Sequence, residues 1–259
     1  AVMNSYEIWI AFRTIVVKEV RRYLRIWPQT LLPPAITMTL YFVIFGTLIG
    51  SRIGEMGGFS YMQFVVPGLI MMSVVTNSYS NVVSSFFGAK FNHSVEELLV
   101  SPVPNWVILT GYVTGGVSRG LMVALIVTCL SLFFADLSVH NIGLTVVIVI
   151  MTSVLFALFG FINAVFANNF DDISIVPVFV LTPLTYLGGV FYSMDLLPDF
   201  WAGVSKLNPL VYVVNGFRYG VLGVSDVNVV FAFSMIFGFT LAAFLFCLHL
   251  LNTGKRLRQ

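Results

Sequence analysis

Residues 142–167 read IGLTVVIVIMTSVLFALFGFINAVFA, and this stretch decides the fold class. It contains no Asp, Glu, Lys or Arg. A helix needs about 20 apolar residues to cross the ~30 Å hydrocarbon core of a bilayer, so the stretch is long enough to span a membrane. Its hydrophobicity is continuous rather than alternating, which favours a helix over a strand of an outer-membrane barrel.

The composition of the whole chain points the same way. Of 259 residues, 58% are hydrophobic and only 9% are charged, whereas roughly 25% of an average soluble domain is charged. So few charged side chains cannot form the polar surface of a soluble protein of this size. The composition therefore excludes an ordinary soluble domain, a disordered chain and a nucleic-acid-binding protein. It predicts an all-α integral membrane protein.

Similar apolar runs predict six transmembrane helices, at residues 31–50, 61–88, 106–135, 142–167, 173–192 and 229–251. Basic residues gather near the two ends of the chain, as Arg13, Lys18, Arg21, Arg22 and Arg25 and as Lys255, Arg256 and Arg258. The positive-inside rule then places both termini in the cytoplasm, which requires an even number of spans. We expect one domain over residues 1–259 without a soluble module, and no cleaved signal peptide.

Residues 1–27 precede the first span and contain an amphipathic pattern. Apolar side chains recur at helical spacing, and basic ones lie opposite, among them Arg13, Lys18, Arg21 and Arg22. The pattern predicts a helix that lies in the cytoplasmic membrane interface. The alternative is a solvated helix whose charges only stop translocation.

Residues 90–105 form a predicted cytoplasmic loop with a short helix at residues 95–100. Ser94 and Glu97 have the spacing of a capping box, and Pro102 stops the helix. We expect Leu98 and Leu99 to form an apolar tip that projects from the cytoplasmic face. The alternative is a loop helix that packs on lipid headgroups.

Residues 193–223 differ from the other apolar segments. The run at residues 209–223 is apolar but contains Arg218 and is too short to cross the hydrocarbon core as a helix. We therefore predict an external re-entrant helical hairpin between spans five and six, buried in protein.

Several polar side chains fall inside predicted spans. Ser73, Asn77, Asn81 and Ser84 share one helical face of span two, and Thr182, Thr185 and Tyr186 lie in span five. Such residues either line a substrate pathway or bond a neighbouring helix. Arg119 in span three must face the bundle, because an arginine that faces lipid at mid-depth costs roughly 2.5–3.5 kcal/mol. It either pairs with backbone carbonyls or binds substrate.

Small residues in span three have a simpler interpretation. Gly111, Gly115, Gly116 and Gly120 are spaced so that neighbouring helices can approach closely.

The sequence lacks the motifs of an enzyme. It has no GxxxxGK[ST] phosphate loop, no HExxH and no GxSxG, and His93, His140 and His249 lie in separate segments. Cys129 and Cys247 both fall in apolar runs, which predicts neither a disulfide nor a zinc site. No Asp or Glu lies in a predicted span, which disfavours proton-driven transport. We expect no catalytic residue, metal or cofactor in this chain.

Two segments resemble a known family. Residues 95–104 (VEELLVSPVP) with 108–111 (ILTG) resemble the coupling-helix region of ABC type-2 exporter permeases. Residues 185–198 (TYLGGVFYSMDLLP), 207–213 (LNPLVYV) and 216–218 (GFR) are similar to the family's span-five end, external hairpin and Asn-Pro turn. The resemblance covers nearly the whole chain and favours the compact YadH-like and NodJ-like branch.

The resemblance implies the permease subunit of an ATP-binding cassette exporter in a bacterial inner membrane. It implies a homodimer in contact with membrane lipid and with two copies of a cytoplasmic ATPase subunit, which binds ATP and Mg. The N-terminal helix and the loop helix would dock on the ATPase, the latter through Ser94, Val95, Glu96, Glu97, Leu98, Leu99, Ser101 and Pro102. Family members often carry several basic residues before the coupling helix, whereas this chain has only Lys90 and His93. The alternative from another class is an ATP-independent channel or scaffold, and the sequence does not identify the substrate.

The first prediction concerns topology. In a background without Cys129 and Cys247, a cysteine at position 140 should react with an impermeant maleimide added to intact cells, because six spans place it outside. A cysteine at position 93 should react only after the cells are opened. External labelling of position 93 would contradict the topology.

Overall fold

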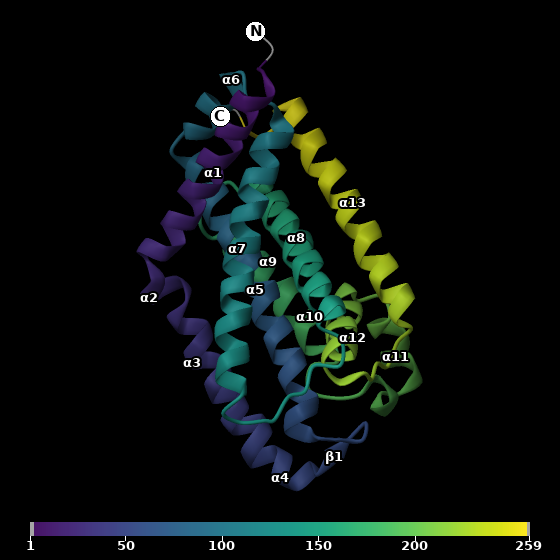
Figure 1. Ribbon diagram of the computed structural model, residues 1–259. Coiled ribbons are helices and arrows are strands. Elements are labelled where there is room, and N and C mark those ends of the chain that lie inside the picture. Colours follow the sequence, from purple (N-terminus) through teal and green to yellow (C-terminus); the bar gives the residue numbers. More distant parts are fainter. Residues whose placement is uncertain (1–2, 258–259) are drawn as a thin grey trace.

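The computed structural model describes residues 3–257, and nearly all of its regular structure is helical. It forms an elongated bundle in which both chain ends lie beside α6 (Ser94–Val100), whereas α4 (Gly50–Ile53) and β1 (Glu55–Met56) lie at the opposite end (Figure 1). The two ends of the chain therefore share one end of the bundle, as an even number of crossings requires. Arg258 lies outside the described residues.

The long helices are α1 (Ser5–Arg25), α5 (Tyr61–Phe91), α7 (Asn105–Ser131), α8 (Ile142–Phe166) and α13 (Val229–Thr253). The first predicted span is built from α2 (Trp27–Thr30), α3 (Leu32–Tyr41), a π-helical stretch (Phe42–Ile49) and α4. The fifth is built from α9 (Asp172–Val176), a π-helical stretch (Pro177–Leu181) and α10 (Thr182–Tyr186). The remaining elements are β2 (Phe59–Ser60), a 3-10 turn (Met194–Leu196), α11 (Asp199–Ser205) and α12 (Pro209–Leu222).

Four helical segments in the described chain are long and apolar enough to cross a membrane: Trp27–Ile53, Asn105–Ser131, Ile142–Phe166 and Val229–Thr253. They correspond to predicted spans one, three, four and six. The helix α5 has 31 residues, but its polar side chains make it less apolar than these four. The segment Asp172–Tyr186 is apolar but shorter. Spans two and five therefore remain predictions.

The predicted boundaries are close to the observed ones where the chain carries clear stop signals. The first span starts at Trp27 rather than Leu31, because Pro28 occupies the first turn of α2, where its missing amide costs no hydrogen bond. The third ends at Ser131, so the connection covers residues 132–141 rather than the residues 136–141 that the predicted spans leave between them. This connection bonds back to α12, since His140 N donates to Val221 O at 2.9 Å.

The predicted external loop between spans one and two is a small β-hairpin. β1 pairs with β2 in antiparallel fashion, with Glu55 opposite Ser60. Gly57 and Gly58 between the strands both have positive φ, which glycine adopts without strain.

The helix α5 lies at the centre of the bundle, and α7, α8 and α12 pack along it. Close approach depends on glycines. A methyl group at Gly160 of α8 would lie 2.5 Å from the carbonyl oxygen of Tyr79 in α5. One at Gly116 of α7 would lie 2.7 Å from Val82 Cγ2. The predicted role of the span-three glycines in helix packing is thus confirmed.

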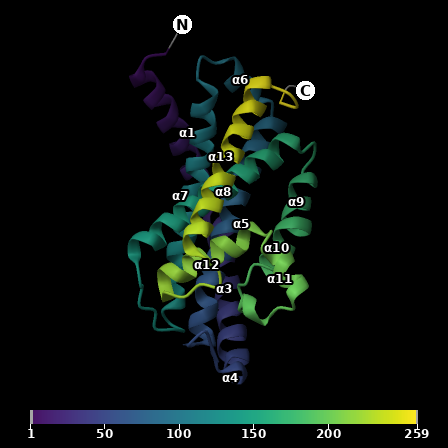
Figure 2. The ribbon, with the colours of Figure 1, turned by 90° about the vertical axis from the view of Figure 1, so that its right-hand side faces the viewer.

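The segment predicted to be a re-entrant hairpin contains two short helices, α11 and α12, of which α12 packs beside α8 and α13 (Figures 1 and 2). α12 has 14 residues, and its side chains are almost all buried. Asn208 begins the helix, because its Oδ1 accepts from Leu210 N while its Nδ2 donates to Leu184 O at 2.6 Å. The re-entrant form of this segment and its external location remain predictions.

The second prediction tests the α5–α8 contact. Gly160→Ala should lower the stability of the detergent-solubilised permease by about 1–3 kcal/mol, because a backbone carbonyl cannot move aside as a side chain can. Gly238→Ala in α13 is the matched control, since nothing lies within 4 Å of the added methyl group. Thermal unfolding monitored by size-exclusion fluorescence would measure both. Equal melting temperatures would refute the close contact.

Candidate coupling and transport sites

The predicted loop helix exists as α6 and lies at the end of the bundle that holds both termini (Figure 1). The predicted capping box is wrong. His93, with a left-handed φ of 60°, precedes the helix, and Ser94 is its first residue without a side-chain cap. Only two residues separate α5 from α6, so Ser94 Oγ reaches back to α5 and donates to Ala89 O at 3.0 Å.

The face of α6 that points outward also differs from the expectation. Val95 is buried, and Leu98 and Leu99 are half-buried against the hydrophobic core, at the i, i+3 and i+4 positions of one helix face. Val100 is instead 81% exposed, and Glu97 is exposed beside it. Val100 is therefore the apolar side chain that projects from α6.

The two residues after the helix complete this loop. Ser101 Oγ donates to Leu98 O at 2.6 Å, and Pro102 is exposed. Glu96 is half-buried, and its Oε1 lies 3.4 Å from His93 Nδ1.

Lys90 is not available for docking. It is buried, and its Nζ donates to Val165 O at 2.8 Å and to Ala167 O at 2.7 Å. These carbonyls lie at the C-terminal end of α8, where a positive charge is favourable. The basic residue predicted next to the coupling helix thus binds the bundle itself.

The N-terminal helix is present as α1 but does not lie across the end of the bundle. Figures 1 and 2 both show it running steeply beside α7. Ile15 packs on Gly111 and Glu19 on Gly115, one helical turn further along both helices. Because both contacts move by one turn along each helix, α1 and α7 run alongside each other. The expected α1 would instead lie in the plane of the membrane interface. Contact with the membrane interface remains a prediction.

Glu19 is the residue that the sequence analysis missed. It is fully buried between α1, α5 and α7, accepts a hydrogen bond from Ser85 Oγ at 2.6 Å, and has Arg22 Nε 3.8 Å from its Oε2. Burial raises the pKa of its carboxyl, and the hydrogen bond from Ser85 and the charge of Arg22 oppose this shift. The only available signal was its spacing, because Glu19 follows Ile8, Phe12 and Ile15 on one helical face.

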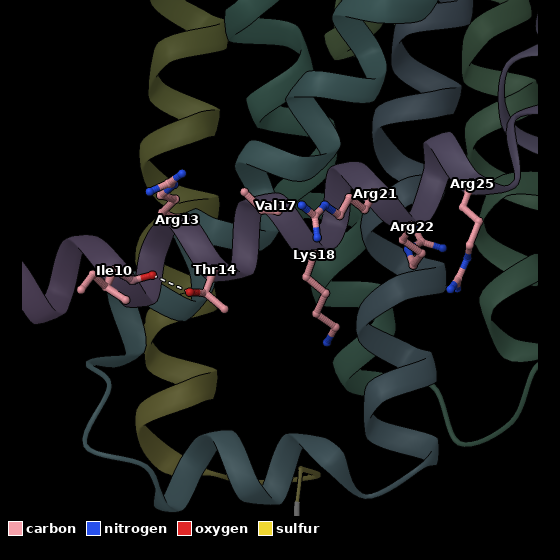
Figure 3. A pocket seen from close by; sticks show the side chains of 8 residues that line it. All are labelled: Ile10, Arg13, Thr14, Val17, Lys18, Arg21, Arg22 and Arg25. Atoms are coloured by element: carbon pink, nitrogen blue, oxygen red, sulfur yellow. Dashed lines mark hydrogen bonds between the residues drawn. The ribbon is translucent and has the colours of Figure 1, made fainter.

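The other predicted basic residues of α1 face outward. Arg13, Lys18, Arg21 and Arg25 are exposed along one open groove of about 940 Å³, whose remaining lining comes from Ile10, Thr14, Val17 and Arg22 of the same helix (Figure 3). Arg22 differs, because its Nη2 turns inward and donates to Asn81 O at 2.9 Å and Asn81 Oδ1 at 3.0 Å. We call the four exposed residues the cationic strip.

The polar face predicted for span two is divided between two roles. Asn81 is buried and bonds α1 through Arg22, as just described. Asn77 is buried, and its Oδ1 accepts from Arg119 Nη2 at 3.1 Å. Ser84 bonds only its own helix. Ser73 is buried and, within the described residues, its hydroxyl has no hydrogen-bond partner.

Arg119 faces the bundle, as predicted, and is 8% exposed. Besides Asn77, its Nη2 contacts Thr30 O at 3.4 Å. Both hydrogen bonds use Nη2, and Nε has no partner among residues 3–257. The expected contact of Arg119 with a backbone carbonyl is therefore present, but it leaves Nε of the guanidinium without a hydrogen-bond partner.

The polar residues predicted in span five do not form one site. Thr182 is exposed, Thr185 is buried, and each bonds its own helix, through Pro177 O and Leu181 O respectively. Tyr186 is 47% exposed and stacks on Phe191 with ring centroids 6.1 Å apart.

Arg218 holds the hairpin to the bundle. It is fully buried in α12, and its Nη2 donates to Gly189 O at 2.9 Å while its Nε donates to Phe64 O at 3.2 Å. Its guanidinium carbon also lies 3.9 Å from the centre of the Phe64 ring. These contacts are structural. The described residues contain no cluster of His, Cys, Asp or Glu that could hold a metal ion.

Comparisons with known proteins agree with this arrangement. A family model described as ABC-2 type transporter matches residues 10–222. The chain is 61% identical over 251 residues to the inner membrane transport permease YadH of Escherichia coli K12, covering 97% of this chain and 98% of that protein. It is 23% identical over 194 residues to nodulation protein J of Rhizobium leguminosarum bv. viciae, covering 73% of this chain and 74% of that protein.

The third prediction follows from the orientation of α6. Truncating Leu98 and Leu99 together to Ala should lower the stability of the permease by about 1–2 kcal/mol per residue, less than for fully buried leucines. Val100→Ala should leave stability unchanged, because that side chain contacts mainly solvent. Melting temperatures of both variants in detergent test this. An unaffected double variant would restore the prediction that Leu98 and Leu99 project from the protein.

Proposed function

The chain belongs to the ABC-2 type transporter family, and from this membership we propose that it is the permease of an ATP-driven exporter. In this proposal two copies of the chain form the membrane path, and two copies of a separate cytoplasmic ATPase bind ATP and Mg and supply the energy. The name of its 61% identical relative supports an inner membrane location. The transported molecule moves outward.

The observation that carries the proposal is the exposed face of α6. Val100 and Glu97 project at the end of the bundle where both chain ends lie, and nothing in the described chain covers them. In this position Val100 is free to enter an apolar pocket on a partner, where its burial would contribute to binding. The sequence has no phosphate loop of its own, so the proposed ATPase must be another chain.

The connections of α6 suit it to transmit movement. It follows α5 after only Asn92 and His93, and it leads through Pro102 and Pro104 into α7. Because its inner face packs on the core through Val95, a displacement of α6 would shift α5 and α7 as one packed unit. The cationic strip on α1 offers a second contact surface for the ATPase or for anionic lipid headgroups.

The second candidate function is an ATP-independent channel or scaffold. It needs no partner at α6, so binding of an ATPase separates the two functions. The natural choice of partner is a soluble protein with a GxxxxGK[ST] motif encoded next to this permease.

The fourth prediction is the test. Co-expressed with that ATPase, the tagged permease should retain it through purification, and Val100→Asp should abolish this, because the substitution would bury an unpaired carboxylate in an apolar contact. Leu207→Asp is the matched control, since Leu207 is 83% exposed in the connection between α11 and α12, within the predicted hairpin. Retention of the ATPase by Val100→Asp would remove α6 from the interface. Failure of the wild-type permease to retain any ATPase would favour the channel or scaffold.

A further inference from the structure

A second hollow, of about 310 Å³, lies between the first span and α5. It is in the size range of small-molecule sites, which begins near 300 Å³. Three groups of residues line it: Gln29, Pro33, Pro34, Thr37, Met38 and Tyr41 from α2 and α3, Met72, Ser73, Thr76, Asn77 and Ser80 from α5, and Arg119 from α7.

The charge of Arg119 is not neutralised by the described chain. Within residues 3–257 no carboxylate lies within 4.0 Å of it, whereas the neighbouring Arg22 has Glu19 at 3.8 Å. Glu19 is paired with Arg22, so among residues 3–257 the charge of Arg119 has no ion-pair partner. An uncompensated buried charge among apolar helices is costly, and an anion beside it would lower that cost.

The hydrogen-bonding capacity of the hollow is also incompletely used. Arg119 makes both of its bonds through Nη2, and its Nε has no partner in residues 3–257. Ser73 lines the same hollow, is buried, and has an unpartnered hydroxyl. Both groups can donate hydrogen bonds, but neither atom is accessible to solvent, so an oxyanion in the hollow reaches them after a rotation of the Arg119 or Ser73 side chain.

Apolar surface continues from the hollow. Met38, Met72 and two prolines form part of its wall, and Ile36 and Leu40 are exposed on the same helix, α3. The ring of Tyr41 lies 5.6 Å from that of Phe45. A molecule with its charged group at Arg119 therefore has apolar surface on which an attached hydrocarbon chain can lie.

We propose that this hollow binds the anionic headgroup, a phosphate or a carboxylate, of an amphiphile, with Arg119 as its charge partner. As a site for cargo, the proposal rests on the proposed function and specifies the class of transported molecule. The same chemistry also fits an anionic bilayer lipid, and the experiment separates the two sources.

The fifth prediction is the binding test. The full-length permease, purified in a neutral maltoside detergent, is titrated with dodecyl phosphate and, separately, with dodecyltrimethylammonium, which has the same chain and the opposite charge. Native mass spectrometry or thermophoresis should show saturable binding of dodecyl phosphate only. Arg119→Gln should weaken it about tenfold or more, because it removes a charge-assisted hydrogen-bond donor.

Two further variants keep the test decisive. Thr76→Phe narrows the hollow from its exposed rim and leaves Arg119 in place, so it should also weaken binding. Arg52→Gln, an exposed cation in α4, should bind like the wild type. Equal affinity of the wild type, Arg119→Gln and Thr76→Phe for dodecyl phosphate would overturn the proposal, as would equal binding of the cationic probe.

Proteoliposomes that contain the permease and its ATPase identify the source. Fluorescently labelled dodecyl phosphate that changes leaflet upon ATP addition, and fails to do so with Arg119→Gln, identifies the bound molecule as cargo. Binding without such movement during ATP hydrolysis supports the site and assigns it to a bilayer lipid. If no ATPase assembles, the proposed function fails, and the binding titration still decides the proposal for the hollow.

Discussion

Three buried cations and the half-buried Arg22 hold the helices of this bundle around α5. Arg22 ties α1 to Asn81, Arg119 ties α7 to Asn77, and Arg218 ties α12 to the carbonyl of Phe64. Lys90 extends from α5 itself to the last carbonyls of α8. In an apolar environment every polar group must find a partner inside the protein, so each of these contacts fixes a neighbouring helix at one depth along α5. The interdigitated glycines then set how closely each helix approaches.

These cations bond amide and backbone carbonyl oxygens much more than carboxylates. Of these four cations, only Arg22 has a carboxylate within 4.0 Å among the described residues, and that carboxylate, Glu19, is buried on α1. Carbonyl partners are supplied by the backbone wherever a helix ends or kinks, which explains how a chain without acidic residues in its predicted spans can bury several cations. The consequence is an excess of positive charge inside the bundle. For Arg218 the excess is distributed over several carbonyls and an aromatic ring, whereas Arg119 has fewer partners and borders a hollow.

The sequence predicted the helices well and their contacts poorly. Hydrophobic run length, the prolines at Pro28 and Pro102 and the shortness of residues 209–223 are local signals, and they located the helices to within a few residues.

The direction in which a side chain points depends on contacts that are distant in sequence. Ser94 and Glu97 have the spacing of a cap, but the tight reversal after α5 turned Ser94 toward Ala89. Leu98 and Leu99 read as a projecting pair, yet the same reversal turned them inward and left Val100 outside. Glu19 was missed for a related reason, because a charged residue on a basic helix is normally solvated.

The arrangement of α1 links the end of the bundle that holds α6 to the same buried contacts. Because α1 runs alongside α7, its inner face shares the buried network of α5 and α7, while its outer face carries the cationic strip. A partner that binds the cationic strip therefore acts on a helix that is fixed to α5 through Arg22, only one turn of α5 away from Asn77 and Arg119.

α6 is also linked to α5, through its covalent connection at residues 92–93. Two separate surfaces at one end of the bundle thus converge on α5, and the hollow beside Arg119 lies where α5 meets the first span. A rigid shift of α5 relative to α3 would change the width of that hollow, since its lining is divided between these helices.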